Sequence, residues 1–163
     1  MSAPSARPPA TPLSSGAILL VSPEPEDSAI LRDILSSSAG GIESVPGWNQ
    51  ATSLLQNGAF GVVITERDLP DGSWLDVLSV IQALSQTPLL IVVSRLADDR
   101  LWAEVLNRCG FDVLLKPFVR DEVIRVVGHA LRKWSEMAPK RPAVRAESGS
   151  YKSTRRVLRA GSA

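Results

Sequence analysis

The chain has 163 residues, of which 44% are hydrophobic and 21% charged, and this fits one globular domain with loose ends. Its formal net charge of +1 gives no strong overall field that would favour a nucleic acid or a membrane as partner. A single cysteine, Cys109, excludes an internal disulfide framework and a structural zinc site, and it favours a reducing, cytoplasmic location.

Composition divides the chain into three parts. Residues 1–15 are rich in Pro, Ser and Ala, lack the apolar segment of a secretory signal, and are expected to form a disordered leader. Residues 16–136 carry the apolar runs of a folded domain, none of which approaches the roughly 20 residues of a membrane span. Residues 137–163 hold seven Lys and Arg against one Glu and are expected to be a disordered, basic tail.

Between the two ends, short apolar runs alternate with segments of helical periodicity. In chain order the pattern predicts a strand at 17–21, a helix at 26–36, a strand at 42–45, a helix at 49–57 ending at Gly58, a strand at 61–65, a helix carrying Leu75, Leu78, Ile81 and Leu84, a strand at 89–93, a helix carrying Leu101, Val105 and Cys109, a strand at 111–115, and a helix carrying Val123, Ile124, Val127, Ala130 and Leu131. The runs are continuous in Val, Ile and Leu, which is typical of parallel strands covered on both faces.

Five strand-helix units of this kind predict an α/β fold, namely an open, doubly wound parallel sheet. Ligands of such sheets bind beyond the carboxyl ends of the strands, so the residues that follow each strand are expected to converge. These are the stretches 22–24, 66–68, 94–95 and 116–117.

Three of these stretches carry recognisable motifs. Asp68-Leu-Pro-Asp-Gly-Ser73 follows the third strand, Ser94 follows the fourth, and Gly110-Phe-Asp-Val-Leu-Leu-Lys-Pro-Phe118 covers the fifth. Together they resemble the receiver domain of response regulators, over roughly residues 16 to 136. The resemblance implies a five-stranded, flavodoxin-like (βα)5 fold with strand order 2-1-3-4-5.

The resemblance also implies the site. In that family an aspartate four residues before the loop proline accepts a phosphoryl group, and two acidic residues after the first strand hold Mg²⁺. A Ser or Thr after the fourth strand contacts the phosphoryl oxygens, a Lys after the fifth pairs with the acceptor, and an aromatic switch residue precedes that lysine.

This sequence keeps only part of that pattern. Glu66 stands at the phosphoacceptor position, and Ser22 and Pro23 stand where the acidic pair is expected. The positions that match are Ser94, Lys116 and Pro117, for which the resemblance implies a cis peptide, whereas the aromatic switch position holds Val113.

These departures change the expected chemistry. Mg²⁺ requires hard oxygen ligands in a near-ideal octahedron, so its binding is expected to be weak or absent, and no other metal or cofactor is expected. Phosphoryl transfer depends on that metal, and a carboxylate displaced by one methylene is badly placed, so we expect no useful transfer to Glu66. Glu66 could instead imitate a phosphorylated aspartate, or simply pair with Lys116 or Arg67.

Three functional hypotheses remain. The first is a degenerate pseudo-receiver that acts by protein contact in a bacterial two-component or phosphorelay pathway, with a histidine kinase or an effector as partner. The second is a phosphorylatable single-domain response regulator, and the third is a protein that contacts nucleic acid through its basic tail. No nucleotide-binding or hydrolase motif supports an enzyme.

The resemblance places the contact surface on the fourth helix, fifth strand and fifth helix, through which receivers usually dimerise or meet partners. Trp102 and Trp134 fall on the two helices, and aromatic residues are enriched at interface cores. Trp134 could equally cover one end of the hydrophobic core.

Overall fold

The computed structural model describes residues 16–36, 41–96 and 98–137, so the predicted leader 1–15 and the chain from residue 138 onward lie outside it. The elements follow in the order β1 (Ala17–Val21), α1 (Pro25–Ile34), β2 (Ile42–Val45), α2 (Trp48–Asn57), β3 (Phe60–Glu66), β4 (Asp68–Leu69), β5 (Gly72–Ser73), α3 (Trp74–Gln82), β6 (Leu89–Ser94), α4 (Asp99–Asn107), β7 (Asp112–Leu115) and α5 (Arg120–Met137). In this part of the chain, no helix has the length and apolar character needed to cross a membrane.

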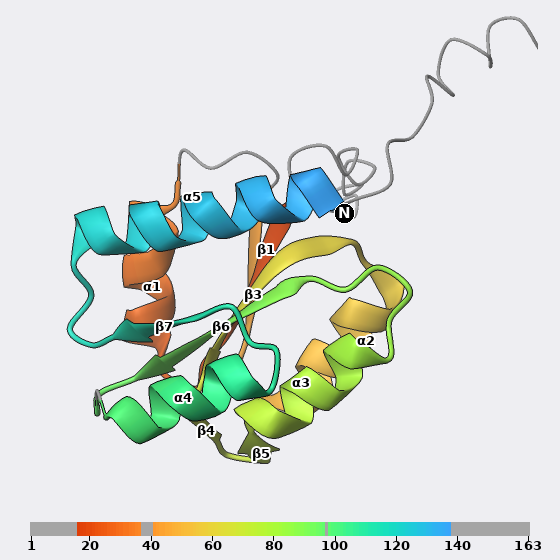
Figure 1. Ribbon diagram of the computed structural model, residues 1–163, viewed down its shortest axis with the longest axis horizontal. Coiled ribbons are helices and arrows are strands. Elements are labelled where there is room, and N and C mark those ends of the chain that lie inside the picture. Colours follow the sequence, from red (N-terminus) through yellow and green to blue (C-terminus); the bar gives the residue numbers. More distant parts are fainter. Residues whose placement is uncertain (1–15, 37–40, 97, 138–163) are drawn as a thin grey trace, which may run out of the picture.

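Five of the strands form one parallel sheet in the order β2-β1-β3-β6-β7 (Figure 1). The other two, β4 and β5, pair with each other as a small antiparallel hairpin between β3 and α3. Counted along the main sheet alone, the order is therefore 2-1-3-4-5. The predicted doubly wound, flavodoxin-like fold is confirmed.

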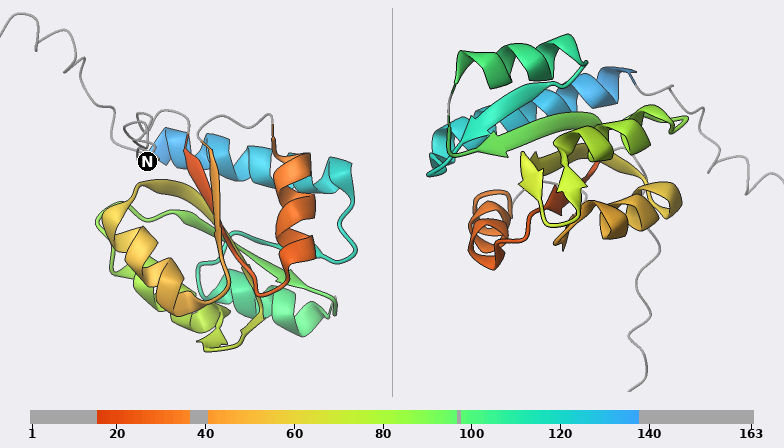
Figure 2. Two further views of the ribbon diagram at one scale, coloured as in Figure 1. Left: turned by 180° about the vertical axis from the view of Figure 1, so that it is seen from behind. Right: turned by 90° about the horizontal axis from the view of Figure 1, so that it is seen from below.

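The sheet separates two hydrophobic cores. Helices α1 and α5 cover one face and α2, α3 and α4 cover the other (Figure 2). Successive residues of β1 alternate between them, because Leu19 and Val21 pack toward α2 to α4 whereas Ile18 and Leu20 pack toward α1 and α5. All four side chains are at most 1% exposed, which explains why the strands read as unbroken apolar runs.

The last turn of α5 is held by Trp134, whose side chain is only 4% exposed. Two glycines make room for its ring: a Cβ atom on Gly61 would lie 3.0 Å from it, and one on Gly16 would lie 3.4 Å from it. Gly16 also has a φ of +53°, which other residues rarely adopt. Trp134 therefore belongs to the core, which decides between its two predicted roles.

The end of α4 differs from the prediction, because Cys109 does not continue the apolar stripe of Leu101 and Val105. The helix ends at Asn107, and Cys109 is exposed with a φ of +70°. The amides of Cys109 and Gly110 donate to the carbonyls of Leu106 and Val105, which is the hydrogen-bond pattern of a Schellman motif. Cys109 thus occupies the left-handed position that usually holds glycine.

Replacing Cys109 by glycine is therefore expected to raise the free energy of unfolding by about 1 kcal/mol, because glycine adopts a positive φ without steric cost. Urea denaturation of Cys109→Gly, with Cys109→Ala as the control that keeps a Cβ atom, measures this effect. Equal stabilities of the two variants would contradict it.

Candidate functional site

The predicted site residues meet at the carboxyl end of the main sheet. Glu66 is the last residue of β3, Ser94 is the last residue of β6, and Lys116 directly follows β7. With Pro23, which follows β1, they line an open cavity of about 240 Å³, whose remaining walls come from Glu24, Arg67, Asp68, Val93, Arg95 and Leu96. The topology therefore brings together side chains that are up to 93 positions apart in the sequence.

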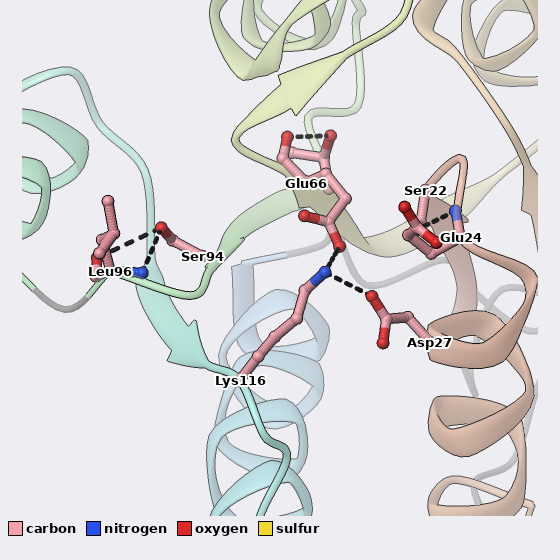
Figure 3. Close-up of polar contacts among 8 residues, drawn as sticks. Ser22, Glu24, Asp27, Glu66, Ser94, Leu96 and Lys116 are labelled. Carbon is pink, nitrogen blue, oxygen red and sulfur yellow. Dashed lines mark hydrogen bonds and ion pairs between the residues drawn. The ribbon is translucent and has the colours of Figure 1, made fainter.

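At the centre of this site, the Nζ atom of Lys116 lies between two carboxylates (Figure 3). One belongs to Glu66, whose Oε1 is 2.5 Å from Nζ, and the other belongs to Asp27 on α1. The three side chains are only 8%, 12% and 13% exposed. Of the two partners that the sequence left open for Glu66, the structure selects Lys116 and not Arg67.

Asp27 was not identified from the sequence. It lies in the first turn of α1, where acidic residues are common because they complement the helix dipole, so its position alone gives no functional signal. The only available signal was its distance along the chain from the missing acidic pair: Asp27 lies four residues after Pro23. Because α1 begins at Pro25, the Asp27 carboxylate lies within reach of Lys116, close to the end of β1.

The cluster carries more negative than positive charge. Burial raises the pKa of the Glu66 carboxyl above its ordinary value, and the hydrogen bond and charge of Lys116 offset only part of this effect. For Lys116, burial acts to lower the pKa, but the hydrogen bonds and charges of Asp27 and Glu66 outweigh it and raise the pKa. The surroundings therefore favour the charged form of Lys116 and disfavour the charged form of Glu66.

The residues at the expected acidic pair take no part in this cluster. The Ser22 hydroxyl accepts a hydrogen bond from the amide of Glu24 at 3.1 Å, which stabilises the turn into α1 (Figure 3). Pro23 has no side-chain oxygen with which to bind a cation. Among residues 16–36, 41–96 and 98–137, no group of three His, Cys, Asp or Glu side chains is arranged to hold a metal ion.

Ser94 lines the cavity, but its hydroxyl is engaged by its own loop. Its Oγ accepts a hydrogen bond from the amide of Leu96 at 3.1 Å and donates to the carbonyl of the same residue at 3.2 Å (Figure 3). To donate to a ligand near Glu66, this hydroxyl would have to give up its hydrogen bond to the Leu96 carbonyl.

The peptide bond between Lys116 and Pro117 is cis, as the family resemblance implied. Val113, at the expected switch position, is 7% exposed and packs in the core beneath α2 to α4. Trp74 fills the same core at 3% exposure. Position 113 thus holds a small, buried aliphatic side chain where the resemblance implies an aromatic one.

The segment after Glu66 is fixed to a neighbouring helix by Asp71. Its two carboxylate oxygens accept hydrogen bonds from the amides of Trp48 and Asn49 at 3.0 and 3.1 Å, and its carbonyl accepts one from the Trp48 indole. The hydrogen bond from the Asn49 amide, with that from Trp48, holds the pKa of Asp71 below its ordinary value. Asp71 therefore caps α2 and is not turned toward Glu66.

Comparisons with known proteins identify the family and the fold of the chain. The family model described as "Response regulator receiver domain" matches residues 18–128. A relative, the response regulator protein PilR of Pseudomonas aeruginosa, is 30% identical over 125 residues, which cover 76% of this chain and 28% of PilR. The chain spans 28% and 47% of the lengths of the two curated relatives that it matches.

Solved structures show the same fold. The signal receiver domain of an HD domain-containing protein from Pseudomonas fluorescens superposes with a TM-score of 0.69 at 23% identity, covering 80% of this chain and 96% of that one. The beryllofluoride-activated NtrC4 receiver domain dimer superposes with a TM-score of 0.67 at 19% identity, covering 72% and 98%.

The altered pKa of Glu66 predicts a pH-dependent effect of Glu66→Gln. Because the folded-state pKa lies above the ordinary value of 4.5, the folded protein binds this proton more tightly than the unfolded chain does. The contribution of Glu66 to the stability of the wild type should therefore fall as the pH rises from 4.5 through the folded-state pKa, and glutamine lacks that loss. The difference in the free energy of unfolding between Glu66→Gln and the wild type is therefore expected to shift in favour of the variant between pH 4.5 and neutral pH.

Urea denaturation at the two pH values measures this difference. Glu24→Gln, which removes an exposed carboxylate from the rim of the same cavity, is the matched control. A difference between Glu66→Gln and the wild type that stays constant with pH would contradict the prediction.

Proposed function

Because this chain belongs to the response regulator receiver domain family, we propose that it acts by protein contact in a bacterial two-component or phosphorelay pathway. In this proposal it is a pseudo-receiver: Glu66 is not phosphorylated, the chain is not an enzyme, and it works in the cytoplasm with a histidine kinase or an effector as partner. The observation that carries the proposal is the state of Glu66, which is a paired glutamate in place of a free aspartate acceptor.

Phosphoryl transfer to a carboxylate is mainly a matter of position and of charge neutralisation. Glu66 is one methylene longer than aspartate, and Lys116 already holds its Oε1 atom. The neutralising Mg²⁺ would need oxygen ligands from positions 22 and 23, where a hydroxyl bonded to Glu24 and a proline stand. These features favour weak or absent Mg²⁺ binding and no transfer.

Protein contact requires an exposed, partly apolar surface, and α4 with its neighbours offers one. Trp102 is 50% exposed and Leu106 is 43% exposed, and their spacing of four residues puts them on the same side of α4. Leu115 is 36% exposed on β7, which packs against α4. Exposed aromatic and leucine side chains on neighbouring elements are typical of interface cores. We propose that this face, which includes α5, mediates contact with a partner or a second copy of the chain.

The absence of phosphorylation can be tested by intact-mass measurement after incubation with acetyl phosphate and Mg²⁺. The wild type is expected to keep its mass, and so is Glu66→Asp, since restoring the acceptor does not restore the acidic pair. The gain of one phosphoryl group by the wild type would contradict the proposal and would favour a phosphorylatable response regulator.

The contact surface predicts a specific effect of Trp102→Glu on self-association. In sedimentation velocity over a concentration series, the wild type is expected to form a dimer, and Trp102→Glu is expected to weaken it by at least about tenfold, because interface aromatics often contribute more than 1.4 kcal/mol. Ile30→Glu on α1 is the matched control, with a similar exposure of 45%. A wild type that stays monomeric throughout would contradict self-association.

A further inference from the structure

The site contains a cation of its own. Lys116 reaches the centre of the cluster from the end of β7, and its ammonium contacts one carboxylate from β3 and one from α1. All three side chains are at least 87% shielded from solvent, so water screens these charges only weakly. In the absence of the ammonium, Asp27 and Glu66 would leave two buried negative charges close together.

The residues present do not fit the divalent metal that the family implies. Mg²⁺ needs six oxygen ligands in near-octahedral order. Here one oxygen of Asp27, Oδ2, and one of Glu66, Oε1, contact an ammonium, the Ser22 hydroxyl accepts from the Glu24 amide, and Pro23 has no side-chain oxygen. A metal ion would have to displace Lys116, and it would be repelled by the lysine charge if it did not.

We propose that the Lys116 ammonium takes the place of a bound metal ion in this protein, and that Asp27 is the positioning residue that makes this substitution possible. Asp27 provides the second carboxylate that the sequence lacks at positions 22 and 23. The inference rests on the proposed function and deepens it, since it names what neutralises the site in a receiver that does not use Mg²⁺.

The substitution has a mechanical consequence. A metal ion joins the elements of a site only while it is bound, whereas Lys116 belongs to the chain and joins α1, β3 and the end of β7 permanently. The relative positions of these elements should therefore not depend on the concentration of divalent ions. This property suits a module whose surface is read in one fixed state.

Thermal unfolding of the full chain, in millimolar MgCl₂ and in NaCl of the same ionic strength, tests the proposal. The wild type is expected to show the same Tm in both salts. Lys116→Gln is expected to lose roughly 10 °C in NaCl, because it leaves two unpaired buried carboxylates. It should regain about 5 °C in MgCl₂, because the vacated position can then accept Mg²⁺.

The double variant Lys116→Gln/Asp27→Asn tests the role assigned to Asp27. It removes one of the two repelling charges, so it is expected to recover much of the lost Tm and to lose the response to MgCl₂. Lys133→Gln, which neutralises an exposed lysine on α5, is the matched control and should behave as the wild type does. A double variant no more stable than Lys116→Gln would overturn the role of Asp27.

Two further results would overturn the proposal. One is a saturable rise of the wild-type Tm with MgCl₂. The other is a Tm of Lys116→Gln that does not rise in MgCl₂. The same conclusion holds if Lys116→Gln folds in neither salt although the double variant folds. The mass measurement distinguishes these failures from a failure of the proposed function. Phosphorylated wild type with an unchanged Tm would refute only the proposed function, and a Mg²⁺-dependent Tm without phosphorylation would refute only the internal cation.

Discussion

The contact of one ammonium group with two carboxylates connects α1, β3 and the end of β7 at the carboxyl edge of this sheet. Burying three charges is costly, and the cost is met only because each charge has an opposite neighbour at hydrogen-bond distance. The consequence reaches beyond the cluster: the first turn of α1 cannot move away from β3 without uncovering Asp27, and the chain after β7 cannot move without uncovering both acids. The site therefore fixes these elements relative to one another.

The hydrophobic pattern was enough to predict the fold, and the reason lies in the two cores. Each central strand is buried on both faces, so nearly all of its side chains are apolar, and runs such as the one from Leu89 to Val93 are visible in the sequence itself. Helical periodicity was informative where it was strict. Val123, Val127, Ala130 and Trp134 continue one stripe of α5, and all four are buried. Trp102 follows the buried Leu101 directly, so it lies off the stripe of α4 and is exposed.

The prediction was less complete where a side chain's partner is distant in sequence or where a helix ends. Ile124 was placed on the apolar stripe of the last helix but is 45% exposed, because it directly follows Val123 and so faces away from the core. Cys109 matched the stripe of α4, but that helix ends at Asn107 and Cys109 takes the left-handed position of the Schellman motif. Asp27 belongs to no motif, and beyond its spacing from Pro23 nothing in the sequence marked it, since its role depends on the position of Lys116, 89 residues away. The motif located Ser94, but the hydrogen bonds of its hydroxyl with Leu96 depend on the local turn of the loop, which the motif does not specify.

The placement of the tryptophans gives this molecule a set of intrinsic optical probes. Of the four tryptophans, Trp74 lies in the core beneath α2 to α4, Trp134 lies beneath α5 against Gly61, Trp48 is partly buried at the start of α2, and Trp102 is half exposed on α4. A small aqueous quencher should therefore reach Trp102 first, Trp48 next, and the two core tryptophans last. Emission that remains after strong quenching reports on the two interiors. A partner that covers α4 should protect Trp102 from the quencher, whereas loosening of the interior should expose Trp74 and Trp134 to it, and the two events can thus be distinguished in the unlabelled protein.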